Sequence, residues 1–125
     1  MLDHSSSKPI YMQIAEWLEN EILSERINPG EKIYSQYQLA DRFNINPATA
    51  AKGLNLLAEE EIVYKRRGLG MFVKDEAPTI IRNKRKNITL NRMLREIVKE
   101  AEYLDVSMDE LGDMLLKIHE EGEDR

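Results

Sequence analysis

The chain begins with a segment whose apolar residues recur at the spacing of an α-helix. They follow one another at intervals of four residues and share one face: Ile10, Ile14, Leu18 and Ile22. Ser7 is placed to cap this helix, and Pro9 suits its first turn, where the missing N–H of proline costs nothing. Pro29 and Gly30 then interrupt the pattern. One amphipathic helix is therefore predicted before residue 29.

Capping signals mark two further helices. Ser35 and Gln38 stand three positions apart, which is a capping-box pattern. Asn46 followed by Pro47 is the best-marked helix start in the chain, because Asn caps free amides and Pro fits the first turn. Only residues 44–46 separate the two helices. Two short helices joined so tightly form a helix-turn-helix.

The hydrophobic period changes after Ile62. Residues 62–66 and 71–74 are rich in β-branched and aromatic side chains, and the stretch 67–70 between them contains two glycines. This pattern is typical of two strands joined by a tight turn. A helix, a helix-turn-helix and a hairpin in this order predict a winged helix-turn-helix domain over residues 8–75, in a chain that is mostly α with a small β-hairpin.

The remaining residues predict a linker and a pair of helices. Residues 76–88 contain Pro78 and several basic side chains without a period, and we expect a basic linker there. Residues 89–121 contain two amphipathic helices, the second opening with a capping box at Ser107 and Glu110. Their narrow apolar stripes consist of Leu90, Leu94, Ile97, Ala101, Leu104, Met108, Leu111, Leu115 and Ile118. Two helices of this size cannot bury both stripes alone, so we expect a C-terminal helical hairpin that serves dimerisation.

Composition and motifs argue against catalysis. The chain has no cysteine, which removes disulfides and thiolate metal sites. His4 and His119 lack a second ligand at metal-binding spacing, and the adjacent carboxylates at 59–61 do not converge on a helix. No dinucleotide or phosphate-loop motif is present. We therefore expect no enzyme, no metal and no cofactor. The absence of a signal peptide and of a long apolar run predicts a cytoplasmic protein.

Although the chain has a net charge of −5, its positive charges are clustered. Lys65, Arg66 and Arg67 run into Gly68 at the predicted hairpin tip. Salt screens surface charges over about 8 Å, so the local charge matters more than the sum. Glycine permits a close backbone approach, and the flanking charges suit phosphates and a narrow groove. A tight turn with solubilising charges explains the same residues without a ligand.

The start of the third predicted helix carries small, polar or basic side chains, namely Asn46, Ala48, Thr49 and Lys52. A helix that enters the major groove of DNA requires such side chains. Capping alone also explains Asn46. Thr49 and Lys52 have no such structural duty.

Residues 34–73 resemble the winged-helix DNA-binding domain of the GntR family of bacterial transcription regulators. The shared motifs are Leu-Ala in the short second helix, a Thr-bearing third helix, LLAEEEIV at 56–63 and Arg-Gly-x-Gly-x-Phe-Val at 67–73. When the first predicted helix and the turn after it are included, the resemblance covers residues 8–74. The resemblance implies a recognition helix in the major groove and a wing glycine at the minor groove. The DNA-binding positions that it implies are Ser35, Tyr37, Asn46, Ala48, Thr49, Lys52, Arg67 and Gly68.

The sequence also departs from the family pattern. Many relatives have arginine where this chain has Tyr37 and Pro47, so the operator sequence does not carry over. The short C-terminal part is similar to the YtrA-type subfamily, whose C-terminal helices serve dimerisation. We therefore expect a homodimeric, sequence-specific repressor that binds a palindromic operator. An alternative is a winged-helix interaction module whose cationic wing docks an acidic protein. No convergent polar cluster defines an effector pocket, and the effector is unknown.

Overall fold

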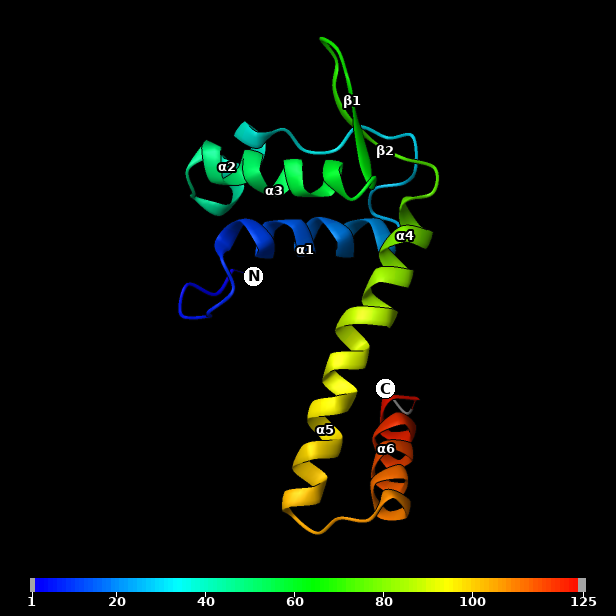
Figure 1. Cartoon of the computed structure of the whole chain (residues 1–125). Helices are drawn as coiled ribbons and strands as arrows, with labels where there is room; N and C mark the ends of the chain where they lie inside the picture. The colour runs from blue at the N-terminus through cyan, green and yellow to red at the C-terminus, as the bar shows by residue number, and fades with distance from the viewer. Residues whose placement is uncertain (1, 124–125) are drawn as a thin grey trace. The chain divides into compact units, whose positions relative to one another are not determined.

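The structure, a computed structural model, describes residues 2–123 and forms two compact units whose boundary falls between Lys84 and Arg85. The first unit contains α1 (Ile10–Leu23), α2 (Gln36–Phe43), α3 (Pro47–Glu59), β1 (Val63–Arg66), β2 (Gly70–Val73) and α4 (Ala77–Lys84) (Figure 1). The second contains the π-helical segment η1 (Arg85–Leu90), α5 (Asn91–Tyr103) and α6 (Met108–Glu123). The fold is thus mostly helical with one antiparallel hairpin, as predicted. No helix within residues 2–123 is long and apolar enough to cross a membrane.

The predicted capping residues define the starts of α2 and α3. Ser35 Oγ accepts a hydrogen bond from the amide of Gln38 at 3.1 Å, and the Gln38 side chain accepts one from the amide of Ser35 at 2.9 Å. Asn46 Oδ1 accepts a hydrogen bond from the amide of Ala48 at 2.8 Å. The start of α1 differs from the prediction. Pro9 occupies the N-cap position without a side-chain bond, so the expected cap at Ser7 is wrong.

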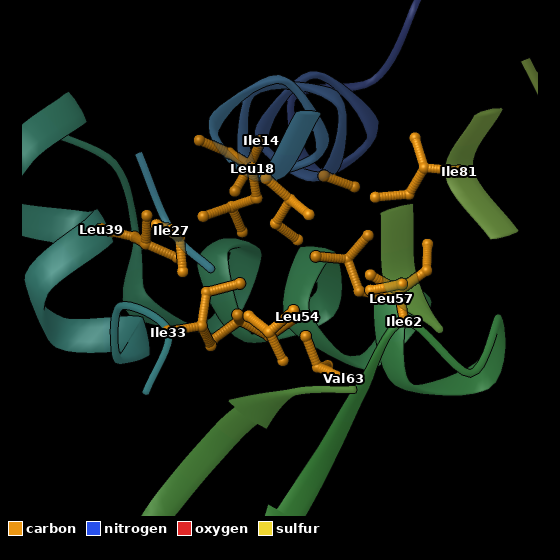
Figure 2. Close-up of a cluster of buried hydrophobic side chains, with 14 of the residues drawn as sticks. Ile14, Leu18, Ile27, Ile33, Leu39, Leu54, Leu57, Ile62, Val63 and Ile81 are labelled. Atoms are coloured by element: carbon orange, nitrogen blue, oxygen red, sulfur yellow. The ribbon is translucent and has the colours of Figure 1, made fainter. Parts of the chain in front are cut away.

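The core of the first unit lies between α1 and α3, with the base of the hairpin at one end (Figure 2). Ile14, Leu18 and Leu57 are wholly buried there. Gly53 lets the two helices approach closely, because a β-carbon at this position would lie 2.8 Å from the carbonyl oxygen of Tyr11. Gly53 is therefore required for the close packing of α1 on α3.

The hairpin gains a third segment that is distant in sequence. β1 and β2 pair in antiparallel register from Val63↔Val73 to Arg66↔Gly70. Lys32 forms a bridge to Phe72 on the other edge of β2, and the amide of Ile33 donates to the carbonyl of Met71 at 2.9 Å. The loop between α1 and α2 is therefore fixed to the base of the hairpin. We refer to the hairpin, residues 63–73, as the wing.

Residues 77–88 of the expected linker 76–88 are helical, so the expectation of a linker without a period is wrong. Ala77 and Ile81 stand one turn apart on α4, and both are completely buried in the core of the first unit. Pro78 lies in the first turn of α4, where proline does not interrupt the hydrogen-bond ladder. Two apolar residues are too few to produce a clear hydrophobic period, and their burial depends on a core that earlier elements build, α1 among them.

An ion-pair cluster also fixes α4 to the first unit. Lys84 Nζ pairs with Glu19 of α1 and, at 3.0 Å, with Glu60 at the end of α3. Burial lowers the pKa of Lys84, but hydrogen bonds to the two carboxylates outweigh it and raise the pKa above its ordinary value. This stabilisation is present below the pKa of an unfolded lysine and is lost as pH rises through the raised pKa. The cluster is therefore intact at neutral pH.

The second unit leaves most of its apolar stripes uncovered. Ser107 Oγ accepts a hydrogen bond from the amide of Glu110 at 3.1 Å, which confirms the predicted cap of α6. Of the stripe residues, Ala101 is buried and Leu111 is half-buried, whereas the others are exposed: Leu90, Leu94, Ile97, Leu104, Met108, Leu115 and Ile118. Ile97, Ala101, Leu104, Leu111 and Met114 line an apolar hollow between the two helices.

Candidate nucleic-acid interface

The first turn of α3 presents a surface of small side chains. Asn44 ends α2 with a φ of 54°, and the chain turns directly into the cap at Asn46. Asn46 and Ala48 are exposed, and Thr49 is half-buried. The structure brings these three predicted residues together. Side chains of this size allow the backbone of α3 to come close to the floor of a groove.

Lys52 lies one turn further along α3 and faces α1. Its Nζ atom is 4.2 Å from the centroid of the Tyr11 ring, which is a cation–π contact. The side chain remains exposed. The Tyr11 ring therefore holds Lys52 beside the other predicted residues of α3. The sequence pattern does not reveal this contact.

Ser35 and Tyr37 lie at the start of α2. The hydroxyl of Ser35 is used by the cap, whereas the Tyr37 side chain is 69% exposed. Arg42 at the other end of α2 stands 4.9 Å from the ring centroid of Trp17, and Phe43 packs edge-on against the same ring. Trp17 thus connects α2 to α1 and sets the position of the helix-turn-helix.

The wing places its basic residues on two faces. Side chains alternate along β1, so Lys65 faces the helices and Arg66 faces away from them. Arg66 packs over the Phe72 ring at 4.8 Å from its centroid. Arg67 and Gly68 are exposed at the tip, where the amide of Leu69 donates to the carbonyl of Arg66 at 2.9 Å. Gly68 has a φ of 78°, the sign that a type II turn requires at its third residue.

A cleft separates the wing from the helix-turn-helix. It is lined by residues 32–37, by three residues of α3 and by Lys65 and residues 68–71 of the hairpin. The α3 residues are Ala51, Leu54 and Asn55. The cleft thus contains four of the predicted DNA-binding residues, namely Ser35, Tyr37, Lys65 and Gly68.

Lys32 and Asn55 are lining residues that the sequence analysis missed. Asn55 is exposed and shares a face of α3 with Ala48 and Ala51, so its helical spacing was an available signal. Lys32 reaches the cleft only because residues 30–33 pair with β2. No local pattern in the sequence reveals that pairing.

A helix-turn-helix with an exposed helix start, beside a basic wing with a glycine at its tip, defines a winged-helix DNA-binding protein. The model of the bacterial regulatory proteins of the gntR family matches residues 10–73, about half of the chain. The chain therefore belongs to the GntR family and is a DNA-binding transcription regulator, which confirms the resemblance seen in the sequence. This family is one of regulators and not one of enzymes.

Some known relatives match this chain over most of its length. The HTH-type transcriptional repressor YtrA of Bacillus subtilis (strain 168) is 29% identical over 117 residues, which are 94% of this chain and 89% of that protein. A solved GntR family transcriptional regulator from Listeria monocytogenes has a TM-score of 0.76 at 25% identity, covering 93% of this chain and 98% of its own. The GntR-family transcription factor YtrA from Sulfolobus acidocaldarius has a TM-score of 0.56 at 29% identity, and the match covers 97% of both chains. The chain is thus a short, YtrA-like member of the family.

Proposed function

We propose that this protein is a homodimeric repressor that binds a palindromic DNA operator in the cytoplasm and has no catalytic role. The observation that carries the proposal is the contrast between one exposed recognition surface in each chain and an apolar stripe that one chain leaves uncovered. The similarity to the repressor YtrA along nearly the entire chain supports repression as the outcome of DNA binding.

In this proposal, α3 enters the major groove with the surface at its first turns. Asn46, Thr49 and Lys52 are the candidate readers of base edges, because their amide, hydroxyl and ammonium groups form hydrogen bonds there. Ala48 lets the helix approach closely. Ser35 and Tyr37, at the start of α2, contact the flanking backbone.

The wing supplies the second set of contacts. Arg67 and Gly68 reach the minor groove from the exposed tip. Lys65 and Arg66 neutralise phosphates, and their opposite orientations direct them to different positions on the DNA. An acidic partner protein remains the alternative ligand for the same wing, and only DNA carries the condensed counterions whose release makes binding fall steeply with salt.

The helical unit supports dimerisation through its exposed stripe. Each fully buried Leu or Ile side chain contributes about 1.5–3 kcal/mol, and the stripe exposes several of them. A two-fold axis lets the same stripe of a second chain cover this surface. Two recognition helices about 34 Å apart then meet successive major grooves on one face of the DNA, and the second half-site raises avidity by about 10²–10⁴.

Selection of bound sequences from random duplex DNA tests the proposal. We expect enrichment of a palindrome that binds about 10³–10⁷ times more tightly than a scrambled duplex, with affinity that falls as salt increases. Sedimentation at micromolar concentration should give a dimer. A monomer, or binding without any enriched sequence, would contradict the proposal, and absence of binding to any duplex DNA, without a steep dependence on salt, would favour the alternative.

A further inference from the structure

We propose that the cleft between the wing and the helix-turn-helix binds the sugar–phosphate backbone of one DNA strand, with Lys32 as a phosphate-binding residue. The inference rests on the proposed binding of DNA by α3 and the wing. It adds a subsite that lies between those two elements and a contact from a loop that belongs to neither.

The backbone pairing of Lys32 fixes where its side chain begins. Lys32 forms a bridge to Phe72, and the next residue, Ile33, donates its amide to Met71 at 2.9 Å. Ile33 is itself buried in the core. The loop is therefore attached to β2 although it is not a strand of the sheet, and the backbone of Lys32 is held in place more firmly than in a free loop.

Gly70 provides the space through which the Lys32 side chain passes. A β-carbon on Gly70 would lie 2.7 Å from Lys32 Cε and 3.4 Å from Lys32 Nζ. Gly70 also has a φ of 107°, which other residues rarely adopt. The second glycine of the wing thus lets the lysine stem lie flat across β2, with its end group in the cleft.

The cleft contains positive charge without acidic partners, whereas three lysines elsewhere in the unit are paired. Lys8, Lys74 and Lys84 each pair with a glutamate. Lys32 and Lys65 line one cleft whose described lining residues include no Asp or Glu, and neither forms an ion pair within residues 2–123. Two unpaired ammonium groups in one concavity repel each other, and this cost is offset when an anion enters.

The position of the cleft identifies the anion. A recognition helix in the major groove and a wing tip in the neighbouring minor groove lie on either side of one sugar–phosphate strand. Leu54 and Asn55 of α3 form one side of the cleft, and Gly68 and Leu69 of the wing form the other. The strand between the grooves therefore passes through the cleft. Lys32 and Lys65 face its phosphates, and the amide of Asn55 donates to a phosphate oxygen.

The decisive variant is Lys32→Met, which keeps the stem that packs on Gly70 and removes only the charge. Affinities for the selected operator and for a scrambled duplex are measured by fluorescence anisotropy at several salt concentrations. Each dimer loses two phosphate contacts, one per half-site, so the slope of log K against log salt should fall in magnitude by about 1.8 and binding should weaken about thirtyfold at 0.15 M salt. Both duplexes should weaken equally, because a phosphate contact carries no sequence information.

Two comparisons complete the experiment. Lys32→Arg retains the charge and should preserve the wild-type slope, while Lys117→Met removes an exposed lysine from α6 and should leave the slope unchanged. An unchanged slope in Lys32→Met would overturn the subsite, as would a loss restricted to the operator, which would make Lys32 a base reader. Failure of the wild-type protein to distinguish operator from scrambled DNA would instead contradict the proposed function.

Discussion

In the winged-helix unit, Ile14, Leu18 and Leu57 are completely buried, whereas in the helical unit Leu104, Met108 and Ile118 are 64%, 66% and 63% exposed. This difference in exposure follows from the number of helices and strands that pack around each apolar surface. The first unit places α1, α3, α4 and the base of the hairpin around one core, so every apolar face finds a neighbour. The second unit has one helical pair, and within residues 85–123 no further layer covers its stripe. The first unit buries most of its apolar side chains within itself, whereas the second leaves a stripe exposed that the proposed dimer would cover.

Removal of the second unit should give the largest effect. A chain that ends at Lys84 retains Ala77, Ile81 and the Lys84 ion pairs, so we expect a folded monomer. Operator affinity should fall by about 10²–10⁴, because the linked second half-site is lost. Sedimentation and anisotropy on a full operator and on a single half-site measure both effects.

The end point of this truncation is critical. A chain cut at Ala77 would lose Ile81 from the core, and removal of such a buried side chain costs about 2–5 kcal/mol. We therefore expect the chain ending at Ala77 to melt at a lower temperature than the one ending at Lys84. Dimerisation of the Lys84-terminated chain would contradict the division of roles between the units.

Local signals were sufficient to predict most of the first unit. The caps at Ser35 and Asn46 depend on side chains two or three residues away from the amides they bind, so the sequence contains all the information. The hairpin depends on a change of period and on Gly68 at the turn. These elements are determined by residues that are neighbours in the chain.

Non-local contacts account for what the sequence did not predict. Pro78 was interpreted as a breaker, but α4 forms because Ile81 packs into a core built by residues far earlier in the chain. Lys32 joins the cleft through pairing with Phe72, forty residues away by their numbers. The cation–π contact of Lys52 likewise requires the packing of α1 against α3. The hydrophobic periodicity of a single segment does not indicate such contacts.

A single charge in the stripe should separate the two chains of the proposed dimer almost as well as truncation does. Leu94→Asp would bury an unpaired carboxylate against a partner chain, at a cost of several kcal/mol. We expect a monomer and a loss of operator affinity that approaches that of the truncated chain. Arg92→Asp, on the polar side of α5, is the matched control and should remain dimeric. A dimeric Leu94→Asp protein would remove this stripe from the interface.

A substitution on α3 should produce the reverse result, with altered DNA binding in an intact dimer. Thr49→Ala should weaken operator binding by about 1–3 kcal/mol per half-site, which is about 5- to 150-fold on a single half-site, if the hydroxyl contacts a base edge. Binding to scrambled DNA should change little, and sedimentation should still give a dimer. Equal weakening on both duplexes would assign Thr49 to a phosphate, and unchanged operator affinity would contradict its place in the interface.

The smallest expected effect concerns whether the first unit holds its recognition residues in place before DNA arrives. Tyr11→Leu removes the ring beneath Lys52 Nζ, whereas Tyr11→Phe keeps it. A cation–π contact at an exposed site contributes about 0.5–1 kcal/mol, so Tyr11→Leu should weaken binding about two- to fivefold per half-site and Tyr11→Phe should not. In a Lys52→Ala background the same change should have no further effect, because the group that the ring positions is absent. Tighter binding by Tyr11→Leu would show that Lys52 must leave the ring to reach DNA. The ring would then restrain the lysine in the free protein, and the first unit would be complete in its core but not yet arranged at its binding surface.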